Sequence, residues 1–399
     1  MAGIWKNTDL NDGTVNSFDA WETCAAKAFN VIVYTGNLFA AYSDDSGDTF
    51  HAMDLGGLCA RYGETPFCDQ VVIYIPQINQ FAWVVLTKAQ NVILAIASPR
   101  EIQDSRGRDW WSWLIPAKQF GDGVSLFDQP SVAVGDHFLY MTCNLGNVAI
   151  GLRLSINELF QRGFLHFPYF VAPNVYWFKP ALSTLETGYF AQLISGDYSH
   201  VRVFSWPEGS NTITWRDVQI ATIPTEDGTV QIPGGDWLSN QRGALSVLGL
   251  TRTGTQLWAA WFANRKVKGQ TTNTFDQPHI GIAIIDVQSG RLVGQRYIWN
   301  PNFAFAYPAL ATNINGDVGL SFCWGGPKSY PQYGVGMLTG SDQRLFSVTA
   351  DANTVAAGGD YTSIRMSFPD VNDFCASGFN QIRASPSNVN HPRYLLFGP

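Results

Sequence analysis

Histidine is scarce in this sequence, and two of the six histidines lie in polar segments where proton transfer is a reasonable role. His200 ends the run Asp197-Tyr198-Ser199-His200, and His279 ends the polar segment 264–279. An imidazole titrates close to neutral pH, so either ring can take a proton from a substrate or return one. Tyr198 or Tyr361 can act as the partner acid. These residue types are those of a lyase that removes a proton next to a carboxylate.

Three aspartates stand immediately before apolar segments that read as β-strands. They are Asp69, Asp128 and Asp360, and the first two are followed by Gln70 and Gln129. Two carboxyl groups on either side of a glycosidic bond can hydrolyse it, and their separation decides the stereochemical outcome. The competing interpretation is structural, because an aspartate at the start of a strand also hydrogen-bonds to the backbone of a neighbouring element.

Cations and aromatic rings complete the set of candidate ligand-binding residues. Arg242 and Arg365 lie in segments read as buried strands, where a cation requires a partner. A substrate carboxylate can supply that partner, and so can Asp128 or Asp360. The other candidates for holding a substrate, by charge or by stacking on a ring, are Lys179, Trp237, Trp324 and Tyr330.

The composition excludes several classes of partner. The chain has 399 residues, of which 46% are hydrophobic, 14% aromatic and only 14% charged, with a net charge of −7. Nucleic acids and anionic membranes attract basic surfaces, and no basic stripe is present. No apolar run reaches the roughly 18–20 residues of a membrane span. We therefore expect neither partner.

The cofactor and cysteine signals are weak. No phosphate-binding, dinucleotide-binding or metal-ligand motif is present, so no cofactor is expected, and a structural calcium ion stays open. Cys59 and Cys68 bracket a short polar segment and form either a disulfide or a pair of buried thiols. The sequence begins without a secretory signal, which fits a mature secreted protein and also a cytoplasmic one.

Short apolar runs separated by Gly, Pro, Asn and Asp recur in groups of four along nearly the whole chain. This pattern is typical of all-β proteins, and a repeat of about 50–60 residues is typical of propeller blades. We expect one domain over residues 1–399, a seven-bladed β-propeller. Its blades would start near residues 21, 70, 131, 181, 244, 309 and 362. The last group has three strands, and the segment around Ile4-Trp5-Lys6 can supply the fourth. The structural alternative is a pair of β-sandwiches.

A propeller would gather the candidate residues at one mouth of its central channel. The loops that lead into the inner strands share a face with the loops between second and third strands. That face would carry Asp69, Asp128, Arg242 and Asp360 from the first set of loops, and His200, His279, Trp324 and Tyr330 from the second.

The segment Ser43-Asp44-Asp45-Ser46-Gly47-Asp48-Thr49-Phe50 resembles the Asp-box of sialidase-like propellers with bacterial neuraminidase repeats. It matches the pattern Ser-x-Asp-x-Gly-x-Thr followed by an aromatic residue, between the third and fourth strands of the first group. The resemblance implies a structural hairpin on the face away from the active site. Sialidase activity itself is not expected, because the first inner strand, residues 22–29, lacks the arginine of true sialidases.

The leading expectation is a secreted, monomeric carbohydrate-active enzyme, a polysaccharide lyase or glycoside hydrolase. It would act on a polysaccharide or oligosaccharide in a cleft at the central channel. The alternatives are a carbohydrate-binding protein without catalysis, in which the aromatic rings stack on sugars, and a scaffold for protein partners.

Overall fold

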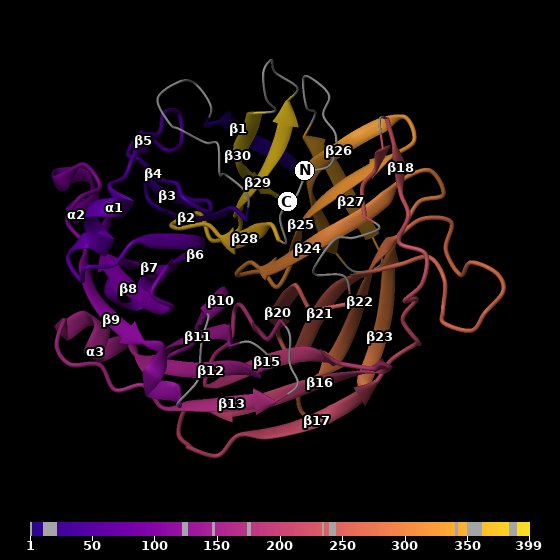
Figure 1. The fold of residues 1–399 in the computed structure, drawn as a ribbon, viewed down its shortest axis with the longest axis horizontal. Coiled ribbons are helices and arrows are strands. Elements are labelled where there is room, and N and C mark those ends of the chain that lie inside the picture. The colour runs from indigo at the N-terminus through magenta and orange to yellow at the C-terminus, as the bar shows by residue number, and fades with distance from the viewer. Residues whose placement is uncertain are drawn as a thin grey trace.

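Seven antiparallel sheets of four strands each are arranged around a central axis (Figure 1). The computed structural model describes residues 2–10, 22–121, 127–145, 148–173, 177–233, 235–238, 245–339, 342–348, 361–382 and 389–399. The predicted seven-bladed propeller is therefore confirmed, and the pair of sandwiches is excluded.

The first four blades follow one another in chain order. Blade 1 contains β2 (Cys24–Ala28), β3 (Val31–Thr35), β4 (Ala40–Ser43) and β5 (His51–Ala52). Blade 2 contains β6 (Pro66–Ile75), β7 (Gln80–Thr87), β8 (Asn91–Ala97) and β9 (Trp111–Pro116). Blade 3 contains β10 (Phe127–Val134), β11 (Phe138–Leu145), β12 (Val148–Ser155) and β13 (Tyr169–Pro173). Blade 4 contains β14 (Lys179–Pro180), β15 (Thr187–Ile194), β16 (Asp197–Pro207) and β17 (Thr214–Gln219).

The last three blades bring the chain back to its beginning. Blade 5 contains β20 (Gly249–Thr253), β21 (Gln256–Ala263), β22 (His279–Asp286) and β23 (Leu292–Ile298). Blade 6 contains β24 (Ala304–Thr312), β25 (Val318–Gly326), β26 (Ser329–Thr339) and β27 (Asp342–Val348). Blade 7 contains β28 (Ser363–Met366), β29 (Phe374–Ile382), β30 (Val389–Gly398) and, as its outer strand, β1 (Gly3–Asp9).

Central strands are buried on both faces because each blade packs between two others. Every residue of β7 is buried, whereas β17, an outer strand, buries only Val218. A strand covered on both faces reads as a continuous apolar run, while an outer strand can carry polar residues. This difference explains why the inner three strands of most blades are legible in the sequence.

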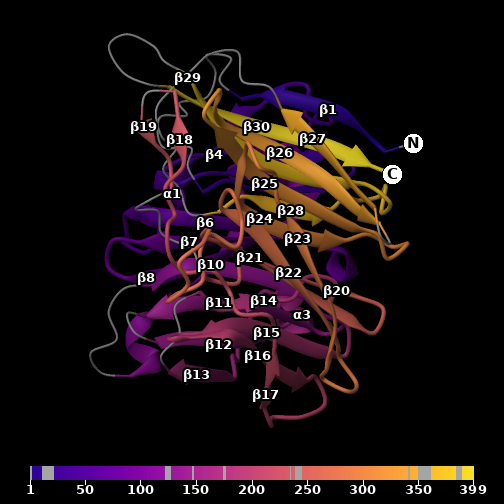
Figure 2. The ribbon, with the colours of Figure 1, turned by 90° about the vertical axis from the view of Figure 1, so that its right-hand side faces the viewer.

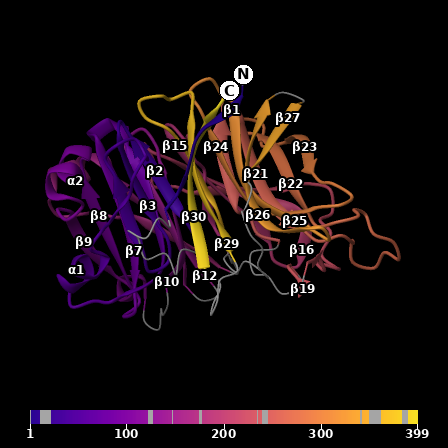
Figure 3. The ribbon, with the colours of Figure 1, turned by 90° about the horizontal axis from the view of Figure 1, so that it is seen from above.

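The ring closes in two ways. Each inner strand contacts the inner strands of both adjacent blades, and the contact between β28 and β2 completes the circle. In addition, β1 pairs antiparallel with β30, with Ile4 opposite Phe397 and Thr8 opposite Tyr394, so the two ends of the chain lie together (Figure 3). The predicted closure of the last blade by the N-terminal segment is confirmed.

Blade 4 departs from its predicted start near residue 181. Its inner strand β14 has only two paired residues, Lys179 and Pro180. Proline has no N–H to donate, and the next N–H, that of Ala181, donates to the carbonyl of Tyr189 in β15 at 2.8 Å. The chain then continues inward, and the N–H of Leu182 donates to the carbonyl of Leu250 in blade 5 at 3.0 Å.

Short elements outside the blades were not predicted. The helices are α1 (Leu55–Ala60), α2 (Pro99–Ser105) and α3 (Ile156–Gln161), on the periphery of the ring, together with the 3-10 turns Pro76–Ile78 and Ala117–Phe120. A two-stranded ribbon, β18 (Gln231–Ile232) and β19 (Gly235–Asp236), lies against blade 6 (Figure 2). None of the helices in the described ranges has the length and apolar content needed to cross a bilayer.

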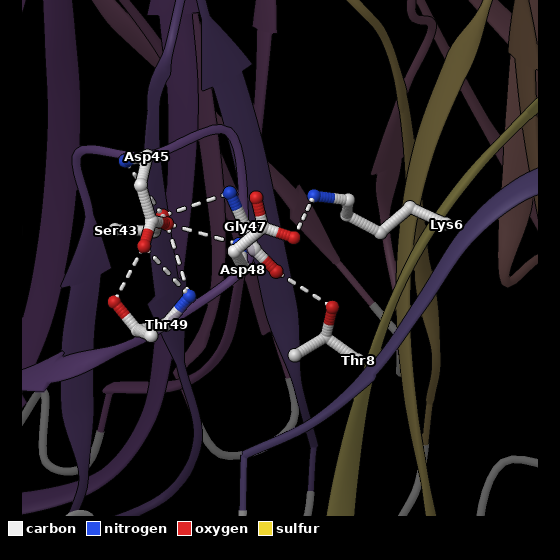
Figure 4. Close-up of polar contacts among 7 residues, drawn as sticks. All are labelled: Lys6, Thr8, Ser43, Asp45, Gly47, Asp48 and Thr49. Carbon is white, nitrogen blue, oxygen red and sulfur yellow. Dashed lines mark hydrogen bonds and ion pairs between the residues drawn. The ribbon is translucent and has the colours of Figure 1, made fainter.

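The segment 43–50 forms the tight hairpin expected of it, between β4 and β5 (Figure 4). The carboxylate of Asp45 accepts hydrogen bonds from the N–H of Asp48 at 2.9 Å and from the hydroxyl of Thr49 at 2.6 Å. Gly47 has a φ of 85°, and a Cβ there would lie 2.8 Å from the ring of Tyr394 in blade 7. Only glycine fits this left-handed position without displacing that ring.

The same hairpin fastens blade 1 to the closing strand. Lys6 pairs with Asp48 at 2.7 Å, and the hydroxyl of Thr8 donates to the carbonyl of Gly47 at 2.6 Å. Phe50 is buried and packs against the ring of Tyr394, with centroids 5.8 Å apart. The hairpin therefore serves the architecture, joining the first and last blades.

Replacing Asp45 by alanine should lower the free energy of unfolding by about 2 kcal/mol at pH 7, because several bonds to a charged acceptor are lost. Burial alone would raise the pKa of Asp45, but hydrogen bonds from Thr49, Ser43 and Asp48 outweigh it and lower the pKa to about 2. Its stabilisation is thus complete above the ordinary pKa of about 3.8 and lost as the pH falls toward 2. Denaturant unfolding at pH 7, 4 and 2.5 measures the difference from the wild type.

The matched control for this prediction is Asp44→Ala, which removes the same charge from the same hairpin. It should leave the unfolding free energy within about 0.5 kcal/mol of the wild type. A deficit for Asp45→Ala that stayed constant down to pH 2.5 would contradict the assignment to the ionised carboxylate.

Candidate functional site

Six of the seven blades begin with a non-glycine residue in the left-handed backbone region. They are Glu22, Asp69, Gln129, Trp177, Leu245 and Tyr307, with φ between 21° and 67°. This conformation is uncommon for residues with a Cβ, so its recurrence at the start of inner strands is a feature of the ring. In blade 7, Tyr361 stands two residues before β28. We call the mouth of the channel where the inner strands begin the strand-start face, and the opposite mouth the strand-end face.

A carboxyl cluster occupies the strand-start face across blades 1 to 3. Asp69 is 3% exposed, and its Oδ2 accepts the N–H of Gln129 in the next blade at 2.9 Å. Burial raises the pKa of Asp69 well above its usual value, and a hydrogen bond with Glu22 adds to the rise. Two carboxylates can share a hydrogen bond only if one of them is protonated. Burial and the contact with Glu22 therefore both favour the protonated form of Asp69.

Asp128 extends this cluster. One oxygen of Asp69, one oxygen of Asp128 and the sulfur of Cys68 all lie within 4.8 Å of one another. Burial and the two nearby aspartates raise the pKa of the Cys68 thiol, so the sulfur keeps its proton. A thiol is a poor ligand for calcium, which prefers six to eight oxygens, and this donor set does not fit that ion. The cluster therefore presents two carboxyl groups and a protonated thiol.

A basic and phenolic group lies on the other side of the channel. The amine of Lys179 donates to the hydroxyl of Ser131 at 2.9 Å and lies 5.6 Å from the ring centre of Tyr361. Burial, together with the nearby charge of Arg365, lowers the pKa of Lys179 to about 8. The hydroxyl of Tyr361 is buried and has no hydrogen-bond partner among the described residues. The channel is thus lined by an amine whose pKa is close to neutral pH and by a phenol hydroxyl without a hydrogen-bond partner among the described residues.

The predicted glutamines serve the architecture around this group. The amide of Gln70 donates to the carbonyls of Gly36 and Asn37 at 2.8 and 2.9 Å, and its oxygen accepts the indole N–H of Trp83. The side-chain oxygen of Gln129 accepts from Asn144 at 2.7 Å. Gln70 holds the inner strand of blade 2 against blade 1 and so positions the adjacent Asp69.

His200 is not brought to the channel. It lies in β16 and pairs with Gln219 of the outer strand β17. Its Nδ1 lies 2.8 Å from Asp197 and 3.1 Å from the hydroxyl of Ser199. In a nucleophilic triad the acid and the hydroxyl bind opposite ring nitrogens, and here they share one. Tyr198 packs against the apolar core of blades 4 and 5.

His279 is enclosed within blade 5. It is the first residue of β22, and its ring stacks on Phe275 with centroids 3.6 Å apart. Burial lowers its pKa to about 3, so the ring is neutral at every physiological pH. Neither predicted histidine therefore lies at the channel, where it could act as a base. The amine that does line the channel is that of Lys179, which the sequence suggested as a substrate-binding residue.

The aromatic candidates separate by exposure. Trp237 is 1% exposed and packs against Gly325, which removes it from the surface. Trp324 is half-buried against Phe303, and Tyr330 lies near the start of β26. These two remain available for stacking. Arg242 and Asp360 lie outside the described residues, and Cys59 and Cys68 are free thiols, which decides between the two interpretations of that pair.

The channel narrows below the strand-start face. Its middle section has a free volume of about 20 Å³, between residues such as Cys24, Ser131, Lys179 and Arg365. That is about the space needed by one water molecule. Lys179, Tyr361 and Arg365 line this narrow section, whereas Asp69 and Asp128 are not part of its wall.

Comparison with known proteins finds only distant likenesses. No family model matches the chain, and no curated protein matches its sequence. Among solved structures, a chain of a mitotic checkpoint complex is 11% identical, with a TM-score of 0.49, over 98% of this chain and 91% of that one. An α-L-arabinanase from Penicillium chrysogenum is 8% identical, with a TM-score of 0.43, over 99% of this chain and 98% of that one. A PL25 ulvan lyase is also 8% identical, with a TM-score of 0.43, over 77% and 78% of the two chains.

Proposed function

We propose that this protein is a secreted, monomeric carbohydrate-active enzyme, a polysaccharide lyase or glycoside hydrolase, with its active site at the strand-start face. One observation carries the proposal. Asp69, whose pKa is raised by burial and by Glu22, lies near Asp128 and close enough to Lys179 and Tyr361 to influence the pKa values of both. Titratable groups whose surroundings move their pKa values in opposite senses are typical of acid and base pairs in enzymes.

As a hydrolase, the site would use its two aspartates. Burial favours the protonated form of Asp69, which would donate a proton to the leaving oxygen, while the less buried Asp128 approaches the sugar. Their nearest oxygens lie within 4.8 Å. Retaining glycosidases have carboxyl groups about 5 Å apart, and inverting enzymes about 6.5–9.5 Å. The short separation favours retention.

As a lyase, the site would use its amine and phenol. A lysine with a pKa of about 8 has a substantial neutral fraction near pH 7.5 and can remove the proton next to a uronate carboxylate. Tyr361 would return a proton to the leaving oxygen, and Arg365 would neutralise the carboxylate. The amine of Lys179 lies 5.6 Å from the ring centre of Tyr361, so the two groups are neighbours.

The test is incubation with a panel of acidic and neutral polysaccharides. New reducing ends without ultraviolet absorbance would indicate a hydrolase, and absorbance from unsaturated uronates would indicate a lyase. Product from no polysaccharide, with saturable binding on a glycan array, would replace the proposal by a binding protein. That alternative is favoured by Asp69 and Gln70, because their hydrogen bonds join adjacent blades and a structural role explains them without catalysis. The absence of both cleavage products and glycan binding would overturn the glycan function altogether.

A further inference from the structure

A second hollow lies at the strand-end face, opposite the proposed active site. It has a volume of about 350 Å³, and residues at the ends of all seven inner strands line it. Pockets for small ligands have volumes of roughly 300–1,000 Å³. We call it the axial cavity and define it by Tyr74, Leu182, Arg252, Ile314, Arg365 and Phe368.

Arg365 lies between the axial cavity and the narrow middle of the channel, and it lines both. One terminal nitrogen donates to the carbonyl of Ile364 at 2.9 Å, and the other lies 3.6 Å from the sulfur of Cys24. Its Nε is buried and makes no hydrogen bond within the described part of the chain. No carboxylate in that part lies within ion-pair distance of it.

Arg252, on the wall of the axial cavity, repeats this arrangement. Its Nε donates to the carbonyl of Gly254 at 3.0 Å, while one terminal nitrogen is buried without a hydrogen-bond partner among the described residues. The carboxylate of Glu186 lies 3.9 Å away and is itself 69% exposed, so solvent screens this pair. A guanidinium presents five donors on three nitrogens, and each of these half-buried arginines has one buried nitrogen without a hydrogen-bond partner among the described residues.

The local charge balance favours an anion. Arg365 lies close enough to Lys179 to lower the pKa of that amine, which places two cations along the axis. Asp136 is the acidic residue on the wall, and it is exposed at the rim. Burying cations without partners is unfavourable, so a bound anion would remove a cost that the folded chain otherwise carries.

Part of the wall is apolar. Tyr74 and Phe368 lie ring to ring at 5.1 Å, and Leu182 also lines the cavity. At the rim, Leu185 and Ile314 are 46% and 65% exposed. A ligand with an apolar body would cover them.

We propose that the axial cavity binds a small organic anion, with a carboxylate or phosphate head at Arg365 and Arg252 and an apolar body against Leu182, Ile314 and Phe368. This site lies at the other mouth of the channel and shares only Arg365 with the proposed glycan site. Its test does not involve turnover, so it can fail while the proposed function stands.

The probe is 8-anilinonaphthalene-1-sulfonate, an apolar ring system with an anionic oxygen head. We expect saturable fluorescence at one site per chain in the wild type. Arg252→Met and Arg365→Met should each weaken binding at least about tenfold. Arg100→Met is the matched control, because it removes the same charge from an arginine that is 90% exposed on α2, and it should bind like the wild type. Equal binding by all four proteins would overturn the site.

Two measurements on the wild type keep the test valid if a variant unfolds. Hydrogen exchange with saturating probe should protect residues 182–185, 252–254 and 311–316, and protection elsewhere with none at these segments would overturn the proposal. Competition with benzoate, phenyl phosphate and benzyl alcohol compares a carboxylate, a phosphate and an uncharged hydroxyl as the polar head of the ligand. Displacement by either anion supports the site and identifies the preferred head, whereas displacement by the alcohol at equal concentration contradicts an anion site.

Discussion

Replacing Asp69 by asparagine should reduce turnover of the cleaved polysaccharide by about 100- to 10,000-fold, the usual worth of a positioned acid. Asparagine has the same shape and can keep both native hydrogen bonds. Its oxygen can accept the N–H of Gln129, and its amide can donate to Glu22 where the protonated carboxyl now does. The variant therefore removes the transferable proton and leaves the geometry of the strand start.

Although the variant should lose turnover, its stability relative to the wild type should increase as the pH rises. A carboxyl with a folded pKa above its unfolded value binds its proton more tightly in the folded state, so wild-type stability falls as the pH rises through that interval. Asparagine does not titrate. We therefore expect the unfolding midpoint of Asp69→Asn, measured relative to that of the wild type, to be higher at pH 8 than at pH 5.

Asp104→Asn is the control for charge, because Asp104 is 71% exposed on α2 and far from any substrate. It should keep full turnover and show no pH-dependent gain. If Asp69→Asn cleaved the polysaccharide at the wild-type rate, Asp69 would be a structural residue between blades 2 and 3 and the catalytic assignment would be lost. A variant that lost stability at pH 8 would contradict the raised pKa of Asp69.

Removing residues 1–10, and with them β1, should lower the free energy of unfolding by more than about 3 kcal/mol. The deletion removes the ladder from Gly3 to Asp9 along β30, the packing of Ile4, and both bonds to the Asp45 hairpin. Buried aliphatic side chains alone contribute about 1.5–3 kcal/mol each. It also exposes the edge of β30 over most of its length, and an unpaired edge promotes association.

Denaturant unfolding and size-exclusion chromatography measure the two effects. Lys6→Ala is the control, because it removes only the ion pair with Asp48 and should cost at most about 1 kcal/mol. A synthetic peptide of residues 1–10 should restore the midpoint by adding back the strand. If the truncated chain unfolded at the wild-type midpoint, the closure by β1 would be dispensable and the ring would hold through its inner strands alone.

Much of the architecture is legible in the sequence because its causes are local. The fully buried run of β7 and the turn residues that follow it predict a central strand without knowledge of its neighbours. The Asp45 hairpin is defined within eight consecutive residues, whose hydrogen bonds are almost all internal. Helix α2 was missed although Ser98 and Glu101 form a capping box in the sequence, because a helix of seven residues has too few turns to show a period.

The composition of the site was legible only in part. Asp69, Asp128, Lys179 and Tyr361 were candidates from their places before inner strands, and the structure places Asp69 beside Asp128 and Lys179 beside Tyr361. His200 and His279 were candidates because they lie in segments expected to join second and third strands. In the structure His200 lies in β16 beside Asp197, and His279 is enclosed against Phe275.

By itself, then, the sequence determined seven four-stranded blades, their closure by the N-terminal strand and the hairpin at Asp45, because short-range patterns encode strands and turns. Tertiary structure alone decided which side chains meet on the axis and what their pKa values become. The left-handed residues at Asp69, Gln129 and Tyr307 accompany register shifts at the strand starts, and none of them is a glycine that would mark the position in advance. Burial and the charge of residues from other blades then set the protonation of Asp69 and Lys179, and those distances exist only in the closed ring.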